Sequence, residues 1–299
     1  MCDELFAFLD EKDVEYKKDV SMRDYCSVRI GGVASVIVFP RTNEELVLLV
    51  RFLYQWRIKY KLIGKMTNIL PLDEGFCGVL VSVVHLCKYV QENRVVKAEC
   101  GVLFSALIMK MANIGLGGAE ELFGIPGTVG GMLTSNAGAF GKEIADLLLS
   151  ANIFLPSENK TLCLDKEELD FGYRTSYFKK TDAVILSAAF LFLPKETEHI
   201  LYEMGKIKEK RIASQPLEYA SAGSVFKRVN GVSAGYYIDK CGLKGTRIGG
   251  AAISDKHAGF IVNLGGASSQ DFRELVRLAK ARVYERAGVE LEEEIEYLC

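Results

Sequence analysis

The feature that most constrains this chain is a glycine-rich segment without positive charge, residues 115–141, which we call the collar. It holds nine of the chain's 28 glycines, and no lysine or arginine lies between Lys110 and Lys142. Glycine has no Cβ, so its backbone can approach a ligand closely and adopt positive φ. Successive exposed N–H groups then form a concavity that binds anions. The collar is therefore either a cluster of tight turns or a loop that holds a phosphate through backbone amides.

A phosphate-binding loop without a cation suits a pyrophosphate that is bound but not cleaved. Phosphoryl transfer, in contrast, requires a cation or a metal at the γ-phosphate. Thr128, Ser135 and Asn136 would assist the backbone amides. The chain contains neither the G-x-G-x-x-G of a Rossmann helix nor the G-x-x-x-x-G-K-[ST] of a P-loop. The two most familiar nucleotide-binding motifs are thereby excluded.

Charge and hydropathy exclude further classes of protein. The formal net charge of −2 and the absence of a Lys/Arg cluster argue against nucleic-acid binding. No apolar run approaches the ~18 residues that a membrane span needs. The N-terminus begins with an acidic, amphipathic stretch that has Leu5, Phe6 and Leu9 on one side, so it does not resemble a secretory signal. We expect a cytoplasmic protein without a membrane partner.

The cysteines and histidines do not predict a metal site. The eight cysteines are scattered without a C-x-x-C pair, which favours a reducing compartment over a disulfide framework. His85, His199 and His257 are far apart in the sequence. We expect no metal.

Alternating strand-like and helix-like patterns fill the chain. A β-branched run within 27–40, a capping box at 42–45 with a helix after it, and a strand at 61–64 predict a β-α-β unit. Further strands are predicted at 78–84, 94–102, 151–155, 161–164, 183–193 and 290–298, and further helices at 103–115, 196–216 and 271–288. The pattern changes near Pro194, which predicts a domain boundary at 194–200.

The exact spelling of the collar decides between turns and ligand loop. GIPGTVGGMLTSNAGAFGKEI (124–144) resembles the signature of the UDP-N-acetylenolpyruvoylglucosamine reductase (MurB) family of FAD enzymes. Further matches follow in the family's order, and together they span nearly the whole chain beyond the first 25 residues: VRIGGVAS (28–35), NILPLDEGFCG (68–78), YRTSYF (173–178), QPLEYASAGSVFKR (215–228), GLKGTRIGGAAIS (242–254), KHAGFIVN (256–263) and LEEEIEYL (291–298).

The resemblance implies an α+β fold. An FAD-binding region of the vanillyl-alcohol-oxidase type would occupy residues 1–195, in two lobes of roughly 1–65 and 66–195, and a C-terminal α+β lobe at 196–299 would bind the UDP-sugar. The short interval between YRTSYF and SAGS is similar to the compact form of the family, which lacks an extra loop over the substrate. The activity implied is NADPH-dependent, FAD-mediated reduction of UDP-N-acetyl-3-O-(1-carboxyvinyl)-glucosamine in peptidoglycan precursor synthesis.

The family's motifs place three catalytic side chains on this sequence. Hydride delivery from the reduced flavin to the substrate double bond leaves an enolate-like charge, which must be stabilised and then protonated. Ser224 matches the proton donor, Arg174 the cation that grips the substrate carboxylate, and Glu294 the acidic partner. Without the resemblance, a turn serine, a surface arginine and a solvated run of glutamates would be the ordinary interpretations.

The resemblance also places the ligand contacts. The non-covalent FAD would meet the first phosphate loop, the collar and one C-terminal segment, at Gly64, Lys65, Met66, Thr67, Asn68, Ile69, Ile125, Pro126, Gly127, Thr128, Gly130, Gly131, Ser135, Asn136, Gly138, Gly249, Gly250 and Ala251. The UDP-sugar would meet Tyr173, Lys227, Arg228 and Asn263.

Two departures from the family pattern leave alternatives open. The first loop usually reads close to G-G-G-S-N, whereas here it is Gly64-Lys65-Met66-Thr67-Asn68, and Glu293 replaces the usual proline before Glu294. One alternative is an inactive nucleotide-binding relative. Another is a flavin oxidase with a covalent cofactor, although RIGG (29–32) has no neighbouring histidine and the collar has no cysteine.

Overall fold

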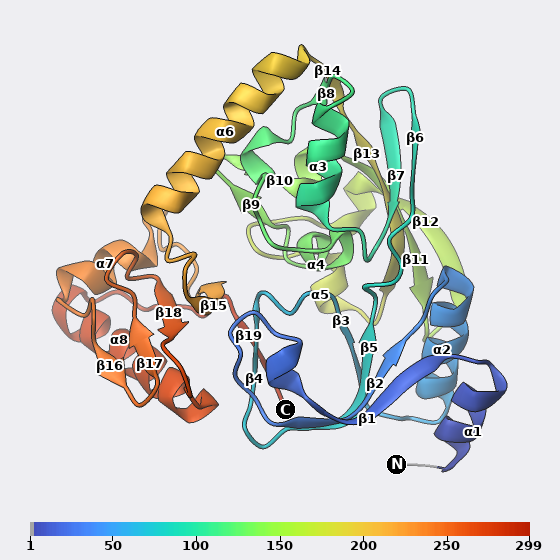
Figure 1. Ribbon diagram of the computed structural model, residues 1–299, viewed down its shortest axis with the longest axis horizontal. Helices are drawn as coiled ribbons and strands as arrows, with labels where there is room; N and C mark the ends of the chain where they lie inside the picture. Colours follow the sequence, from blue (N-terminus) through green and yellow to red (C-terminus); the bar gives the residue numbers. More distant parts are fainter. Residues whose placement is uncertain (1–2) are drawn as a thin grey trace. The chain divides into compact units, whose positions relative to one another are not determined.

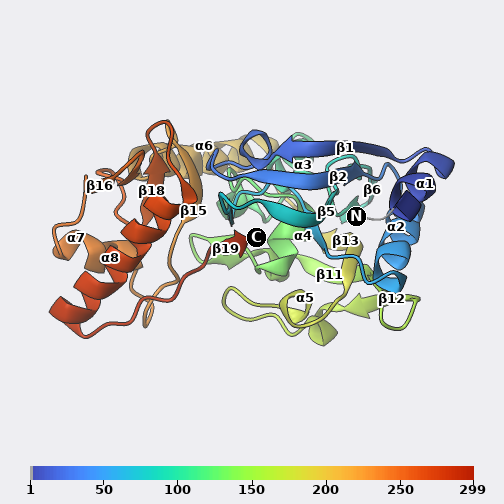
Figure 2. The same ribbon diagram turned by 90° about the horizontal axis from the view of Figure 1, so that it is seen from below.

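The described part of the chain, residues 3–299 of this computed structural model, folds into two units that are interleaved in sequence (Figure 1, Figure 2). The first unit contains the described residues up to Lys17, then Val36–Lys65 and Gly78–Glu209. The second contains Lys18–Ser35, Met66–Cys77 and Lys210–Cys299. The predicted boundaries near residues 65 and 195 divide the sequence linearly and stay a prediction.

Helices and strands are mixed along the chain, as the predicted α+β class requires. The α-helices are α1 (Asp3–Glu11), α2 (Asn43–Gln55), α3 (Phe104–Ala112), α4 (Val129–Thr134), α5 (Tyr177–Lys180), α6 (Thr197–Ser214), α7 (Ala234–Lys240) and α8 (Ser269–Ala287). The strands are β1 (Glu15–Ser21), β2 (Val33–Phe39), β3 (Tyr60–Ile63), β4 (Ile69–Pro71), β5 (Phe76–Ser82), β6 (Tyr89–Glu92), β7 (Val95–Glu99), β8 (Leu116–Gly117), β9 (Gly138–Ala139), β10 (Lys142–Glu143), β11 (Leu148–Leu155), β12 (Lys160–Asp165), β13 (Val184–Leu191), β14 (Leu193–Pro194), β15 (Ala220–Ser224), β16 (Arg247–Ile248), β17 (Ala251–Ile253), β18 (Phe260–Asn263) and β19 (Glu296–Leu298). Among residues 3–299, no helix has the length and apolar character to cross a membrane.

The predicted β-α-β unit is present, with one difference in its cap. β2, α2 and β3 follow in order, and β3 pairs in parallel with β5, which lies between β2 and β3 in the sheet β1-β2-β5-β3. Thr42 Oγ1 accepts the amide of Glu45 at 3.1 Å, as an N-cap does. The Glu45 carboxylate accepts the Arg41 amide at 2.8 Å. Only the Thr42 half of the predicted capping box is therefore formed.

A five-stranded antiparallel sheet, in the order β12-β11-β13-β7-β6, dominates the first unit. Its central strand β13 is nearly buried throughout, because its sequence VILSAAFL is apolar or small on both faces. The edge strand β12 alternates exposed and half-buried positions. The strands predicted at 94–102, 151–155, 161–164 and 183–193 are thus confirmed with shifted ends.

The second unit is built on a smaller sheet, β15-β18-β17-β16, with α8 beside β16 and β17 (Figure 1). α8 begins at Ser268, whose hydroxyl accepts the amide of Asp271 at 3.0 Å, and ends at Gly288 with φ 62°. The predicted helix at 271–288 is confirmed. The predicted strand at 290–298 is wrong in extent, because only Glu296–Leu298 forms β19, parallel to β4.

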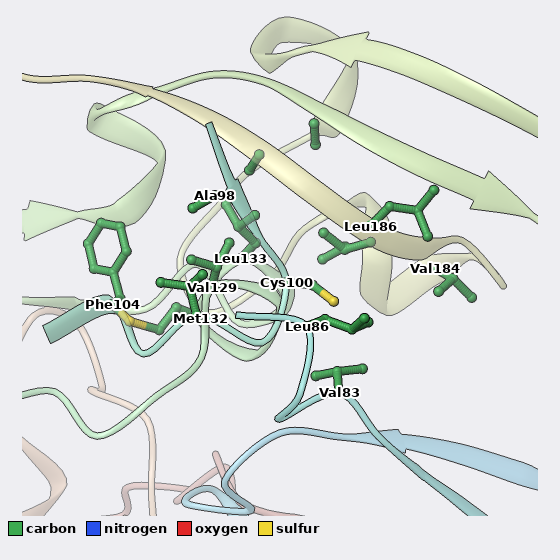
Figure 3. Close-up of a cluster of buried hydrophobic side chains, with 14 of the residues drawn as sticks. Val83, Leu86, Ala98, Cys100, Phe104, Val129, Met132, Leu133, Val184 and Leu186 are labelled. Atoms are coloured by element: carbon green, nitrogen blue, oxygen red, sulfur yellow. The ribbon is translucent and has the colours of Figure 1, made fainter. Parts of the chain in front are cut away.

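The core of the first unit reaches the collar through Cys100. The Cys100 side chain lies among Val83, Leu86, Val129 and Leu186 (Figure 3). Its burial raises the pKa of the thiol to about 12. Cys100 is therefore an inert packing side chain, and helix α4 of the collar lies on this core.

Gly101, next to this core, is expected to tolerate no side chain. A Cβ at Gly101 would lie 1.8 Å from the Val83 carbonyl oxygen and 2.6 Å from that of Leu86. Both obstacles are backbone atoms, so we expect Gly101→Ala to lower the free energy of unfolding by about 3 kcal/mol. Gly205→Ala is the matched control, since that position in α6 has nothing within 4 Å and gains up to about 1 kcal/mol of helix propensity. Urea unfolding followed by circular dichroism measures both, and equal stability of the two variants would contradict the prediction.

Candidate active site

The collar is a folded segment that includes the short helix α4. The sequence does not predict α4, because its six residues include Gly130 and Gly131, which disfavour helix. Tertiary contacts decide the conformation. The Gly130 amide donates to the Cys100 carbonyl at 2.8 Å, and a Cβ at Gly130 would lie 3.2 Å from the Cys100 Cβ. The Gly131 amide donates to Thr128 Oγ1 at 3.3 Å. These two amides hold the collar on its own core.

The start of the first phosphate loop lies against the collar. A Cβ at Gly64 would lie 2.5 Å from Thr128 Oγ1, so only glycine allows this approach. Within the collar, a Cβ at Gly127 would lie 2.8 Å from Met132 Cγ, and one at Gly138 would lie 2.7 Å from the Lys142 carbonyl. The first unit therefore has two glycine-bearing backbone segments side by side, which suits a ligand held by main-chain groups.

The rest of the first phosphate loop contains a bulky side chain at a position with a left-handed backbone. Met66 adopts φ 47°, a left-handed conformation that favours glycine, and its side chain is buried. The Met66 carbonyl accepts the Ser27 amide at 3.3 Å within the second unit. A glycine would adopt this conformation without strain, whereas Met66 adopts it at an energetic cost.

Arg174 lies against the C-terminal end of the collar. Its Nη1 donates to the Asn136 carbonyl at 3.4 Å and its Nη2 to the Gly138 carbonyl at 3.1 Å. The guanidinium carbon lies 5.5 Å from the ring centroid of Tyr173, and Arg174 itself has φ 56°. Nearby, Ser176 Oγ donates to the Thr134 carbonyl at 2.8 Å. The YRTSYF motif is therefore docked on the collar.

Asn136 is the buried centre of this junction. Its Nδ2 donates to Glu143 Oε2 at 2.6 Å and to the Gly172 carbonyl at 3.0 Å. Its Oδ1 accepts the Ala145 amide at 3.4 Å. The backbone of Asn136 has φ 42°, which asparagine tolerates better than most residues. The Asn136 side chain therefore stabilises the collar through hydrogen bonds to residues 143, 145 and 172.

Ser224 and Glu294 are brought together within the second unit, whereas Arg174 belongs to the first. Ser224 ends β15 opposite Phe260, and the next residue, Val225, accepts the Glu294 amide at 2.8 Å. The Glu294 carbonyl accepts Asn68 Nδ2 at 3.0 Å. The last residues of the chain thus place Glu294 beside the serine strand, about 70 positions earlier in the sequence.

The surroundings of Ser224 include a histidine that sequence reasoning did not assign to the site. A Cβ at Gly259 would lie 3.4 Å from Ser224 Oγ and 2.9 Å from Cε1 of His257. His257 Nδ1 accepts the Gly259 amide at 3.1 Å, which requires that nitrogen to be unprotonated. Burial lowers the pKa of His257, so the ring is neutral at pH 7. The KHAGF spelling is the sequence signal that points to it.

The other predicted contacts have structural partners of their own. A Cβ at Gly249 would lie 2.3 Å from a carboxylate oxygen of Asp271, and Ala251 is buried in β17. Asn263 Nδ2 donates to the carbonyls of Val28 and Arg29 at 3.0 and 3.1 Å. The Gly250 amide donates to Asp271 Oδ2, Lys227 Nζ pairs with Glu292, and Arg228 Nη1 donates to the Gly231 carbonyl. Their contacts with FAD or substrate stay predictions.

Glu120 is a buried charge that the sequence pattern does not single out. Its side chain is 5% exposed, accepts Lys195 Nζ at 2.9 Å and accepts the Gly118 amide at 2.7 Å. Burial disfavours the charge, but Lys195 and the Gly118 amide outweigh it and hold the pKa of Glu120 below its ordinary value. This ion pair anchors the turn Glu120–Leu122 within the collar.

Comparison with known proteins identifies relatives along the whole chain. The C-terminal domain of UDP-N-acetylenolpyruvoylglucosamine reductase matches residues 215–298, and an FAD-binding domain matches residues 34–160. The UDP-N-acetylenolpyruvoylglucosamine reductase of Caldicellulosiruptor saccharolyticus is 38% identical over 292 residues, which cover 97% of this chain and 94% of that protein. The reductase of Clostridioides difficile is 38% identical over 295 residues, covering 98% and 96%. The crystal structure of the reductase from Thermus caldophilus superposes with a TM-score of 0.82 at 34% identity, covering 96% of this chain and 99% of that one.

Proposed function

The chain belongs to the UDP-N-acetylenolpyruvoylglucosamine reductase family, and we propose that Ser224, Arg174 and Glu294 are its catalytic side chains. It is a flavin-dependent oxidoreductase that uses FAD and NADPH to reduce UDP-N-acetyl-3-O-(1-carboxyvinyl)-glucosamine to UDP-N-acetylmuramate in peptidoglycan synthesis. The observation that carries this function is 38% identity with a reductase across 97% of the chain. The predicted α+β class, with an FAD-binding domain and a C-terminal reductase domain, is confirmed by the matching domains.

The residues present fit the cofactor. A Cβ at Gly64 would clash with the Thr128 side chain, so the glycine lets the first phosphate loop begin directly against the collar. Residues 64–69 and the collar would hold the dinucleotide, with Lys65 next to Gly64 in the sequence and with Asn136 supporting the collar through its bonds to Glu143 and Gly172. When bound and reduced by NADPH, FAD would supply the hydride that is added to the carbon–carbon double bond of the substrate.

Ser224 delivers the proton in this proposal. Its Oγ transfers a proton to C2 of the substrate, next to the carboxylate. A serine hydroxyl is a weak acid, so it donates only to a strongly basic enolate and only when it is positioned for that transfer. Support comes from its place at the end of β15, where the flanking Gly223 has φ 77° and the nearby Gly259 has no side chain.

Arg174 and Glu294 stabilise the charge that develops on the substrate. The planar fork of Arg174 suits a carboxylate and the enolate it becomes, and its two bonds to collar carbonyls orient the fork. Glu294 acts within a hydrogen bond to the substrate, because a bare anion beside an enolate would oppose the reaction. Its backbone is held on both sides, by Val225 and by Asn68.

Tyr173, Lys227, Arg228 and Asn263 bind the UDP-sugar in this proposal. A pyrophosphate requires cations, and Lys227 and Arg228 follow Ser224 closely in the sequence. Lys227 Nζ now pairs with Glu292, which is largely exposed, so it can exchange this partner for a phosphate. We also place the reaction in the cytoplasm. The free thiols at Cys26, Cys77, Cys87, Cys100, Cys163 and Cys241 support a reducing compartment.

An absorbance spectrum of the purified protein, followed by anaerobic additions, tests the function. We expect a yellow protein whose flavin is released by trichloroacetic acid, and whose NADPH consumption requires the enolpyruvyl substrate. Yellow colour that stays in the acid pellet would indicate a covalent oxidase. A colourless protein that does not take up added FAD would indicate an inactive relative.

A further inference from the structure

The residue before the proposed catalytic Glu294 has a network of its own. Glu293 is half-buried, with 23% of its side chain exposed. Its Oε1 accepts Lys280 Nζ of α8 at 2.8 Å, and its Oε2 accepts the hydroxyl of Tyr297 in β19. The Glu293 carboxylate therefore joins the longest helix of the second unit to the last strand of the chain.

The backbone on both sides of Glu293 is bonded to the segment that follows Ser224. The Lys227 amide donates to the Glu292 carbonyl at 2.9 Å, and the Glu294 amide donates to the Val225 carbonyl at 2.8 Å. Glu293 itself forms an antiparallel bridge with Phe226. In an extended segment neighbouring side chains point to opposite faces, so anchoring the Glu293 side chain determines which face Glu294 presents.

Charges around Glu293 keep it ionised. Burial opposes its charge, but the hydrogen bonds from Lys280 and Tyr297, with the charges of Lys280 and Arg273, hold the pKa of Glu293 below its ordinary value. Burial and the nearby Glu293 raise the pKa of Tyr297, so its hydroxyl stays protonated and donates a hydrogen bond to the Glu293 carboxylate. The guanidinium of Arg273 lies 5.9 Å from the Tyr297 ring centroid. A single anion is thus surrounded by three donors or cations.

We propose that Glu293 is a positioning residue for the reaction. Its carboxylate, held between Lys280 and Tyr297, sets the direction in which Glu294 faces the substrate. The inference rests on the catalytic role proposed for Glu294.

Half-reaction kinetics of the holoenzyme test this tether. We expect Glu293→Gln and Lys280→Met each to slow reoxidation of the reduced flavin by the enolpyruvyl substrate by about 10- to 100-fold, the usual cost of misplacing a reacting group. Reduction of the flavin by NADPH and the FAD content are expected to stay unchanged. The double variant is expected to be no slower than either single variant, because one tether is removed in all three.

Two further variants separate the possible outcomes. Glu285→Gln removes an exposed α8 carboxylate that pairs with Arg282, and is expected to behave as the wild type. Glu294→Gln tests the underlying role. If Glu294→Gln is slow while Glu293→Gln and Lys280→Met are not, the tether is refuted and the catalytic role stands. If Glu294→Gln reoxidises normally, the catalytic role itself is wrong.

Equal slowing of both half-reactions by Glu293→Gln, or additive effects in the double variant, would reduce the tether to a stabilising contact. Should Glu293→Gln fail to fold, Lys280→Met removes the tether from the helix side.

Discussion

Ser224→Ala is expected to leave reduction of the bound flavin by NADPH intact and to slow its reoxidation by the enolpyruvyl substrate by about 10²- to 10⁴-fold. The change removes one oxygen atom and keeps the backbone of β15, which is fixed by pairing with β18. NADPH reduction requires no proton from Ser224, whereas protonation of the substrate enolate does. Anaerobic stopped-flow absorbance separates the two half-reactions.

Ser221→Ala is the matched control, because it removes a hydroxyl from the same strand. Ser221 contacts Ser27 through its backbone, because its carbonyl accepts Ser27 Oγ at 2.6 Å. We expect this control to retain both half-reactions. Equal loss of both half-reactions in Ser224→Ala would show that Ser224 holds the site together and does not donate the proton.

Arg174→Lys is expected to lower kcat by about 10²- to 10³-fold and also to weaken FAD binding. Both residues are cations without branching at Cβ, so the left-handed backbone at φ 56° costs each of them about the same. The change therefore isolates the guanidinium fork. Lysine cannot donate to the Asn136 and Gly138 carbonyls in the same geometry while it also grips a carboxylate. Steady-state kinetics give kcat, and quenching of flavin fluorescence gives the FAD affinity.

Arg57→Lys serves as the control for Arg174→Lys. Arg57 is exposed beyond the end of α2 and also has a left-handed backbone, with φ 52°. We expect it to leave kcat and FAD affinity unchanged. If Arg174→Lys weakens FAD binding but keeps kcat at saturating FAD, then Arg174 only braces the collar and another residue grips the substrate carboxylate.

Much of the fold was predictable because local patterns agree with the tertiary structure. The β-branched run that becomes β2, the helical spacing of α2 and α8, and the glycine at the end of α8 each signal their own element. Local patterns did not predict helix α4 and predicted strand β19 to be too long, because tertiary contacts decide both elements. α4 forms despite two glycines because Cys100 and the buried core hold it, and β19 is shortened because residues 292–294 bond to the 225–227 segment.

The sequence could predict which residues belong to the site, but not the contacts that each of them makes. Motif spelling points to Ser224, Arg174 and Glu294, but nothing in the run Leu291–Glu296 tells which glutamate serves which purpose. The structure distinguishes them by their partners, because Glu292 pairs with Lys227, Glu293 with Lys280 and Tyr297, and the Glu294 backbone with Val225 and Asn68. Three consecutive glutamates thus have different surroundings, because each contacts residues that are distant from the others in the sequence.

By itself, the sequence determined the family, the reaction and the mixed helix–strand class, because motif spelling and hydrophobic periodicity are local properties of the chain. Only the tertiary structure decided which of the collar's amides serve its own core and how Arg174 is braced on the Asn136 and Gly138 carbonyls. The same holds for the tether from Glu293 to Lys280. Hydrogen bonds and ion pairs require atoms within about 3 Å of each other, and chain folding alone brings residues so distant in sequence to that separation.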